Sequence, residues 1–311
     1  MKPKEITIQP FIDSRHGLCP GCGSAAAMAH VQSIISEPLP SGKIKKIRSV
    51  VIPASCWSIG SGQDGVSFIG ANIVHTPFIA GATVGEGISI MSKRRGLAGK
   101  EITMVWAGDG ASFDIGLGLL SGAAIRNADI LYVINDNQTY GNTGAQESGA
   151  TPWGAKTQTS PAGKTIPQKD IIEIMLAHKI PYYASLALSV TTLDDFYAKV
   201  RRAADMEGFR CLHILSVCPP GWKCDSDSAP SLAELAVQTR VFPLVEITDG
   251  RLRLTKPRRE KPIEEFLKRQ KRFSAILDSP ESLREFQERI DRRWNYLLRL
   301  EEITNAGQPA I

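Results

Sequence analysis

The chain has 311 residues, of which 42% are hydrophobic and 22% charged, so it can bury a sizeable core as one large domain or two smaller ones. Its formal net charge is +5, but residues 251–272 alone carry ten basic and three acidic side chains. Because the positive charge is confined to one late stretch, we expect no nucleic-acid partner. No apolar run reaches the ~20 residues that a membrane span needs, and the start has no apolar leader, which favours a cytoplasmic protein with no membrane contact.

The first hundred residues predict two helices and one strand. The Ala-rich segment after CPGCG favours a helix that begins near Ser24. The apolar segment KIRSVVIPA is typical of a buried strand that ends at Pro53. Small residues and several glycines at 76–91 indicate a helix packed closely against a neighbour.

The clearest pattern is a strand, a helix and a second strand in succession. Residues 102–108 and 130–136 are apolar and strand-like, and residues 111–127 between them are typical of a helix. Such a βαβ unit requires a parallel sheet that is covered on both faces. The alternation continues as a strand, a helix and a strand at 180–187, 194–206 and 211–217. We therefore predict an α/β fold, a doubly wound and mostly parallel sheet with a C-terminal helical extension.

The C-terminal part is predicted to be an extension of that fold. We divide the chain into a domain, residues 1–250, and an extension, residues 251–311, which consists of a basic linker and a helix. Ser279 can cap this helix, with Pro280 at its first position. The apolar residues of the helix recur at three- and four-residue steps and are Leu283, Phe286, Ile290, Leu297 and Leu298. Two alternatives are open: the helix docks on a neighbouring subunit, or it folds back on its own domain.

A glycine-rich turn follows the first strand of the βαβ unit. Gly108, Asp109 and Gly110 stand at the carboxyl end of a strand and open a helix, where open α/β sheets bind phosphorylated cofactors. Glycines let the backbone approach a diphosphate, and an Asp can hold the Mg²⁺ that bridges its phosphates. Asn137, at the end of the next strand, can supply a second oxygen ligand. The alternative is a tight turn followed by a strand-end cap.

Two cysteines form a knuckle ahead of the first helix. Cys19 and Cys22 have the C-x₂-C spacing that binds either Zn²⁺ or an iron–sulfur cluster, and spacing alone does not separate the two. Of the other cysteines, Cys211 is predicted to be buried in a strand.

Several strings resemble the β subunit of 2-oxoacid:ferredoxin oxidoreductases, the pyruvate synthase family. The longest is DNQTYGNTGAQESGATPWGAKTQTSPAGK at 136–164, and CPGCG, GDG and CPPGW occur in the same order around it. The resemblance runs from Gly17 to about Trp222, and the C-terminal quarter matches only loosely. It implies a domain at residues 1–250 that binds thiamine diphosphate and a cluster.

The resemblance also implies roles for individual residues. Asp109, the Asn137 side chain and the Thr139 carbonyl would hold Mg²⁺, Gly108 and Gly110 would face the diphosphate, and Asn142 would lie at the thiazolium ring and substrate. A [4Fe–4S] cluster would be bound by Cys19, Cys22, Cys56 and Cys218. Cys224 lies close to Cys218 in the sequence and is the alternative fourth ligand.

As a member of this family the chain would take part in the oxidative decarboxylation of a 2-oxoacid, with pyruvate as the first choice and an aromatic 2-oxoacid or oxalate as alternatives. Coenzyme A would be the co-substrate, and a ferredoxin-like carrier would take the electrons. The Glu that activates the cofactor belongs to another subunit in this family, so α-type and γ-type partners are implied and this chain alone is expected to be inactive. The rival classes are a non-oxidative thiamine-dependent decarboxylase or synthase and a zinc-stabilised scaffold subunit.

A possible dinucleotide motif is set aside. Gly60, Gly62 and Gly65 match G-x-G-x-x-G, but the residues that follow read as a short apolar segment ended by Pro77. The motif requires a long helix at that place.

Overall fold

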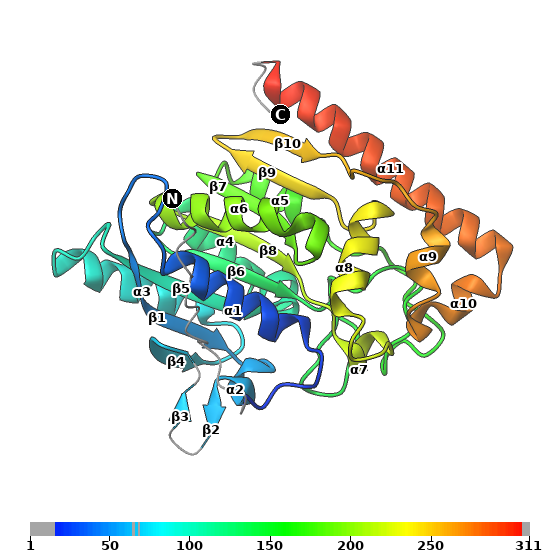
Figure 1. The fold of residues 1–311 in the computed structure, drawn as a ribbon, viewed down its shortest axis with the longest axis horizontal. Helices are drawn as coiled ribbons and strands as arrows, with labels where there is room; N and C mark the ends of the chain where they lie inside the picture. Colours follow the sequence, from blue (N-terminus) through cyan, green and yellow to red (C-terminus); the bar gives the residue numbers. More distant parts are fainter. Residues whose placement is uncertain (1–15, 64–65, 68, 307–311) are drawn as a thin grey trace, which may run out of the picture.

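Eight strands form one sheet in the order β10-β9-β7-β8-β6-β5-β1-β4 (Figure 1). The computed structural model describes residues 16–63, 66–67 and 69–306 of the chain. The strands from β4 to β7 pair in parallel, whereas β9 pairs antiparallel with β7 and β10 antiparallel with β9. The predicted mostly parallel sheet is confirmed.

The elements of the fold have the following bounds. The strands of the large sheet are β1 Lys46–Pro53, β4 Asn72–Thr76, β5 Glu101–Gly108, β6 Leu131–Asp136, β7 Tyr182–Ala187, β8 Arg210–Leu215, β9 Leu244–Thr248 and β10 Arg251–Thr255, and β2 Gly62–Gln63 pairs with β3 Val66–Ser67. The α-helices are α1 Gly23–Ile35, α2 Trp57–Gly60, α3 Gly81–Arg94, α4 Leu117–Ile125, α5 Ile171–Ala177, α6 Leu193–Asp205, α7 Pro219–Trp222, α8 Ala229–Gln238, α9 Ile263–Leu267, α10 Ser274–Leu277 and α11 Pro280–Asn305. A π-helical turn spans Gly110–Asp114, and 3₁₀ turns span Val190–Thr192 and Lys271–Phe273.

Helices cover both faces of the sheet because the central strands are apolar on both sides. In β5, Val105 and Ala107 point into one core, and Met104 and Trp106 point into the other. Helices α3, α4, α5 and α11 contribute to the first core, and α1 and α6 to the second. The doubly wound architecture is therefore also confirmed.

Two helix predictions need correction. The segment 76–91 is not one helix, because β4 continues to Thr76 and Pro77 separates it from α3, which begins at Gly81. The segment 111–127 is divided at Gly116 into a π-helical turn and α4. In the set-aside glycine motif, residue 65 lies outside the described residues, but a short strand and no helix follows it.

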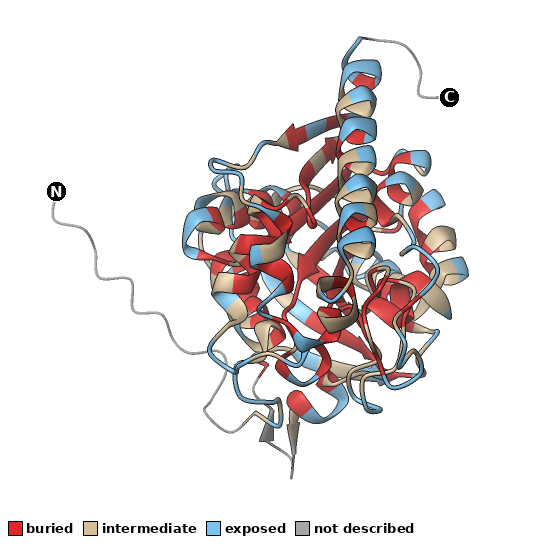
Figure 2. Ribbon diagram, turned by 90° about the vertical axis from the view of Figure 1, so that its right-hand side faces the viewer, coloured by how far each residue is buried: buried red, intermediate tan, exposed pale blue. Residues whose placement is uncertain are grey.

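Part of the expected basic linker is folded into the sheet. Residues 251–255 form the edge strand β10, in which Leu252 and Leu254 are buried and the alternate arginines are not. The long helix α11 lies along this edge (Figure 1), and Trp294 and Leu297 are buried in one of the sheet cores. Figure 2 shows buried and partly buried residues recurring along this helix among exposed ones. The helix folds back on its own chain, which is the second of the two alternatives.

An ion pair fastens this helix to the sheet layer. Nε of Arg293 lies 2.8 Å from Oδ2 of Asp170, whose other oxygen accepts the Ile172 N–H and so caps α5. Burial acts to raise the pKa of Asp170, but the Arg293 charge and the backbone N–H groups outweigh burial and hold the pKa below its ordinary value. A carboxyl group with a lowered pKa stabilises the fold above its unfolded pKa of about 4 and loses that contribution as the pH falls through the folded pKa.

We therefore expect Asp170→Asn to lower the free energy of unfolding by about 1.5–3 kcal/mol at pH 7, the range for a hydrogen bond to a charged group. The difference from the wild type should shrink as the pH falls from about 4 through the lowered folded pKa, because the carboxyl is then protonated first in the unfolded and then in the folded chain. Urea unfolding at pH 7 and at pH 3 measures both, and the exposed Asp227→Asn serves as the matched control. A loss of equal size at the two pH values would show that the ion pair is not its cause.

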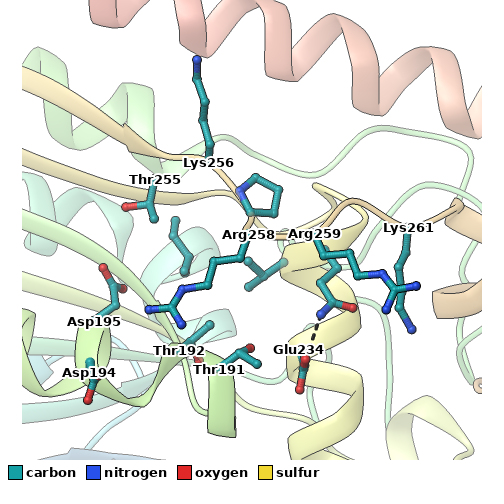
Figure 3. A pocket seen from close by; sticks show the side chains of 14 residues that line it. Thr191, Thr192, Asp194, Asp195, Glu234, Thr255, Lys256, Arg258, Arg259 and Lys261 are labelled. Atoms are coloured by element: carbon teal, nitrogen blue, oxygen red, sulfur yellow. Dashed lines mark hydrogen bonds between the residues drawn. The ribbon is translucent and has the colours of Figure 1, made fainter.

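A cavity of about 400 Å³ lies where residues 255–261 pass α6 and α8 (Figure 3). In Figure 3 the Arg258 side chain points toward the side of the cavity that carries Asp194 and Asp195. Glu234 accepts a hydrogen bond of 2.8 Å from Gln238 on the α8 side. The basic segment thus runs beside acidic residues of its own chain. No described helix is both long and apolar enough to cross a membrane.

Candidate active site

The predicted site residues meet at the carboxyl ends of four neighbouring strands. Asp109 follows β5, Asn137 follows β6, Cys56 follows β1 and Cys218 follows β8, and these strands are adjacent in the order β8-β6-β5-β1. A cavity of about 470 Å³ opens there. Its lining consists of Ala54, Ser55, Cys56, Ser58, Phe78, Gly108, Asp109, Gly110, Asn135, Asn137, Thr139, Tyr140, Gly141, Asn142 and Thr143.

Asp109 is a buried carboxylate, 3% exposed, at the start of the π-helical turn. Its Oδ2 accepts a hydrogen bond of 2.6 Å from the Ser148 hydroxyl. Burial, and then the nearby Asp136 carboxylate, raise the pKa of Asp109 well above its ordinary value. A buried carboxylate in such surroundings is costly unless a cation pairs with it. The Asp109 carboxylate is therefore a suitable ligand for a divalent cation at the carboxyl end of β5.

The second part of the site is the turn after β6. The Asn137 side-chain oxygen accepts the Thr139 N–H at 3.3 Å, and the Asn137 carbonyl accepts the Trp222 indole N–H at 2.8 Å. Thr139 is buried, and its hydroxyl donates to the Gln146 carbonyl at 2.7 Å. These contacts fix the turn, so Asn137 and Thr139 lie with Asp109 on the same cavity.

Asp136, just before this turn, is held by a buried network. Its Oδ1 accepts the Gln138 N–H at 2.9 Å, and its Oδ2 lies 2.8 Å from Nε2 of His213. The other ring nitrogen of His213 lies 2.9 Å from the Tyr183 hydroxyl. The network anchors the end of β6 to β8 and β7.

Asn142 lies on the exposed tip of the loop that borders the cavity. The base of this loop is closed by a bridge between Tyr140 and Gln146. Asp114 then ties the loop to the π-helical turn, because it accepts the Tyr140 hydroxyl at 2.7 Å and the Gly149 N–H at 2.8 Å. The loop places Asn142 at the open side of the cavity, away from Asp109 at its buried end.

The cysteine-bearing segments are fastened to one another beside the sulfurs. The Gly23 N–H, next to Cys22, donates to the Val217 carbonyl, next to Cys218, at 3.0 Å. On the other side, the Trp57 indole, next to Cys56, donates to the Ser24 hydroxyl at 2.6 Å. These two bonds join α1, α2 and the end of β8.

Cys56 and Cys218 have other cysteines as electrostatic neighbours, whereas Cys224 does not. Burial, and then the nearby Cys22 and Cys19 thiols, raise the pKa of Cys56 to about 11. Burial and the same group of thiols raise the pKa of Cys218 to about 12. The charged neighbours of Cys224 are instead Arg272 and Asp225, and no other cysteine is among the groups that shift its pKa. Cys211 is buried in β8, as predicted.

The four thiols share one region without surrounding a single point. Within the described ranges, no three His, Cys, Asp or Glu side chains are grouped to hold one metal ion. The thiolates of a [4Fe–4S] cluster each bind a different iron atom, so they stand around a larger object than one ion.

Two glycines, Gly141 and Gly221, lie between the Asn137–Thr139 turn and the thiols of Cys56 and Cys218. A Cβ on Gly141 would lie 2.8 Å from Nδ2 of Asn137 and 3.4 Å from Sγ of Cys56. A Cβ on Gly221 would lie 2.8 Å from Cγ2 of Thr139 and 3.2 Å from Sγ of Cys218. Larger residues at these two positions would force the turn and the sulfurs apart, so only the two glycines lie between the Asn137–Thr139 turn and the thiols of Cys56 and Cys218.

Three residues of the site carried no signal in the sequence. Ser148 bonds Asp109 and Asp114 holds the loop, but neither belongs to a recognisable spacing. Arg272 was placed in the basic linker, yet it is 2% exposed and bonds Gln138 in the turn after β6.

The fold and a matching family profile define an α/β subunit of the thiamine-pyrophosphate-enzyme type. The family profile described as "Thiamine pyrophosphate enzyme, C-terminal TPP binding domain" matches residues 66–214. The pyruvate synthase subunit PorB of Thermotoga maritima is 37% identical, over 94% of this chain and 93% of that protein. The ketoisovalerate oxidoreductase subunit VorB of Pyrococcus horikoshii is also 37% identical, over 96% of this chain and 97% of that protein.

Among solved structures, the 2-oxoglutarate:ferredoxin oxidoreductase of Magnetococcus marinus, with 2-oxoglutarate, coenzyme A and succinyl-CoA bound, has a TM-score of 0.55 at 22% identity. The match covers 75% of this chain and 81% of that one, and it supports the fold. The chain belongs to the β-subunit family of 2-oxoacid:ferredoxin oxidoreductases, and the predicted family is confirmed.

Proposed function

We propose that this chain is the subunit that binds thiamine diphosphate and a [4Fe–4S] cluster in the oxidative decarboxylation of a small 2-oxoacid. In the proposed reaction, a 2-oxoacid, coenzyme A and two oxidised one-electron carriers give an acyl-CoA, CO₂, a proton and two reduced carriers. The observation that carries the proposal is the closeness of the Asn137–Thr139 turn to the thiols of Cys56 and Cys218, from which Gly141 and Gly221 alone separate it. It supports a cofactor site that delivers electrons to an adjacent redox centre.

Asp109, Asn137 and the Thr139 carbonyl are the proposed ligands of Mg²⁺. The Asp109 carboxylate supplies the charge, and Ser148 orients it through the bond to Oδ2. Gly108 and Gly110 line the same cavity and leave room for a diphosphate. When bound, thiamine diphosphate supplies a thiazolium ring that accepts the electron pair left behind when CO₂ departs.

Cys19, Cys22, Cys56 and Cys218 are the proposed cluster ligands. They come from three segments that are joined by the bonds of Gly23 and Trp57, and their thiols are electrostatic neighbours. A cluster there supplies a one-electron acceptor, which Zn²⁺ does not, because Zn²⁺ has no redox chemistry.

The proposed enzyme is a heteromeric complex. Asn142 lies at the exposed side of the cavity, which supports a substrate site completed by a second subunit. By resemblance, the activating Glu belongs to another subunit, the partners are α-type and γ-type subunits, and a ferredoxin-like protein is the acceptor. This chain alone should therefore be inactive, and its cytoplasmic location stays a prediction.

Pyruvate is the proposed substrate, and reconstitution with the partner subunits tests this choice. Asp109 is the one charged side chain among the described residues that line the cavity, and the rest of the lining is uncharged. We expect kcat/KM to be highest for pyruvate, lower for 3-methyl-2-oxobutanoate and phenylpyruvate, and lowest for 2-oxoglutarate. Anaerobic viologen reduction with coenzyme A measures all four, and oxalate is assayed alongside. A higher kcat/KM for one of the other 2-oxoacids would change the proposed substrate but not the proposed reaction. CO₂ release without viologen reduction would favour a non-oxidative enzyme.

A further inference from the structure

Arg272 is a fully buried cation on the C-terminal segment that packs against the site. The segment docks on α7, since the Lys271 N–H donates to the Lys223 carbonyl at 3.2 Å. The Arg272 guanidinium lies 3.8 Å from the centroid of the Trp222 ring. That ring belongs to the turn that begins at Cys218, whose carbonyl accepts the Trp222 N–H at 2.8 Å. Arg272 therefore stacks on a side chain of the turn that carries a proposed cluster ligand.

The partners of Arg272 are neutral. Its Nε donates to Oε1 of Gln270 at 2.9 Å, and its NH2 group donates to Oε1 of Gln138 at 2.8 Å. In the part of the chain that the structure describes, no carboxylate forms an ion pair with it. The other deeply buried arginine, Arg210, does pair with a carboxylate, that of Asp129.

A buried guanidinium without an acid is costly, because it gives up hydration without a compensating charge. Burial lowers the pKa of Arg272 to about 9, while the sulfurs of Cys224 and Cys218 and then the Asp136 carboxylate favour its charged form. One of these groups, Cys218, is a proposed cluster ligand.

We propose that Arg272 is a positioning residue that supplies a fixed positive charge to the cluster and raises its reduction potential. The inference rests on the proposed function, because four thiolates around a [4Fe–4S] core give the anionic partner that Arg272 lacks. Reduction adds one electron to the cluster, and the guanidinium stabilises that added charge while keeping its own proton. Burial makes the effect strong, since the medium between the two charges is packed side chains and not water.

A redox titration of the assembled complex, followed by the electron paramagnetic resonance of the reduced cluster, tests this role. Arg272→Gln should lower the midpoint potential. We expect the ratio of reduced to oxidised cluster at a fixed potential to fall about tenfold, which for a one-electron couple is a shift of about 59 mV. Arg272→Lys keeps the charge and should stay near the wild type. The exposed Arg269→Gln removes the same charge from the same segment and should leave the potential unchanged, because water screens it.

A second variant covers the case in which Arg272→Gln does not assemble the cluster. Gln270→Glu places a carboxylate on Nε of Arg272 with little change of shape, and it should lower the midpoint potential in the same direction. Wild-type potentials in both Arg272→Gln and Gln270→Glu, at full iron content, would overturn the role of Arg272 and leave the proposed function intact. A wild-type complex without cluster iron would instead overturn the proposed function, and the role of Arg272 with it.

Discussion

Replacing Asp109 with alanine is expected to abolish retention of thiamine diphosphate. The variant removes the one charged oxygen ligand proposed for Mg²⁺, so the diphosphate loses the cation that neutralises it. We expect affinity to fall by more than about 100-fold, or roughly 2.8 kcal/mol. Isothermal titration of the assembled complex with thiamine diphosphate and Mg²⁺ measures this loss. Asp109→Asn keeps the oxygen but not the charge and should fall between the variant and the wild type.

A stability measurement separates this loss from misfolding. Asp109 is a buried carboxylate next to Asp136, so alanine should leave the melting temperature of the cofactor-free protein unchanged or slightly higher. The exposed Asp227→Ala should bind the cofactor as the wild type does. Stoichiometric thiamine diphosphate in the Asp109→Ala complex would show that the ligand assignment is wrong.

Serine at Cys19, Cys22, Cys56 or Cys218 is expected to remove the cluster. Each thiolate is proposed to bind one iron, and a serine hydroxyl is a poor substitute for it. Iron and acid-labile sulfide should fall to near zero in each variant, together with the visible absorbance of the anaerobically purified protein. Activity should fall with them, because electrons have no path out of the site.

Cys224→Ser is the matched control for this series. Cys224 lies within six residues of Cys218, yet its electrostatic neighbours are Arg272 and Asp225. It should keep the full iron content and the full reduced-cluster signal. If Cys218→Ser keeps the signal while Cys224→Ser loses it, the two residues exchange roles.

The approach of Asp109 and Asn137 to one cavity could be predicted from the sequence because it depends on local geometry. In a βαβ unit the two strands lie side by side in parallel, so residues at both carboxyl ends meet without knowledge of the remaining fold. Asp109 and Asn137 follow this rule, since β5 and β6 pair directly. The prediction that Cys56 and Cys218 belong to the site rested on the family resemblance. Their positions depend on the order of strands that are distant in sequence.

The supporting residues could not be predicted because their partners are remote. Ser148 is 39 residues from Asp109, and Arg272 is 134 residues from Gln138. The charge of residues 251–272 indicated a basic linker, but composition does not show which basic side chain is buried. In β10 the alternation of leucine with arginine is a strand signal that the net charge obscured. The apolar residues that recur at three- and four-residue steps along α11 predicted an apolar face, but not which surface this face packs against.

The most direct test of the central claim is the electron paramagnetic resonance of the anaerobically assembled complex after addition of a 2-oxoacid and coenzyme A. If the chain joins a thiamine diphosphate site to a [4Fe–4S] cluster, the reduced-cluster signal should appear only when the 2-oxoacid is present, and it should be absent in Asp109→Ala. CO₂ release from a colourless, iron-free complex, or a zinc-containing complex that retains no thiamine diphosphate, would contradict it.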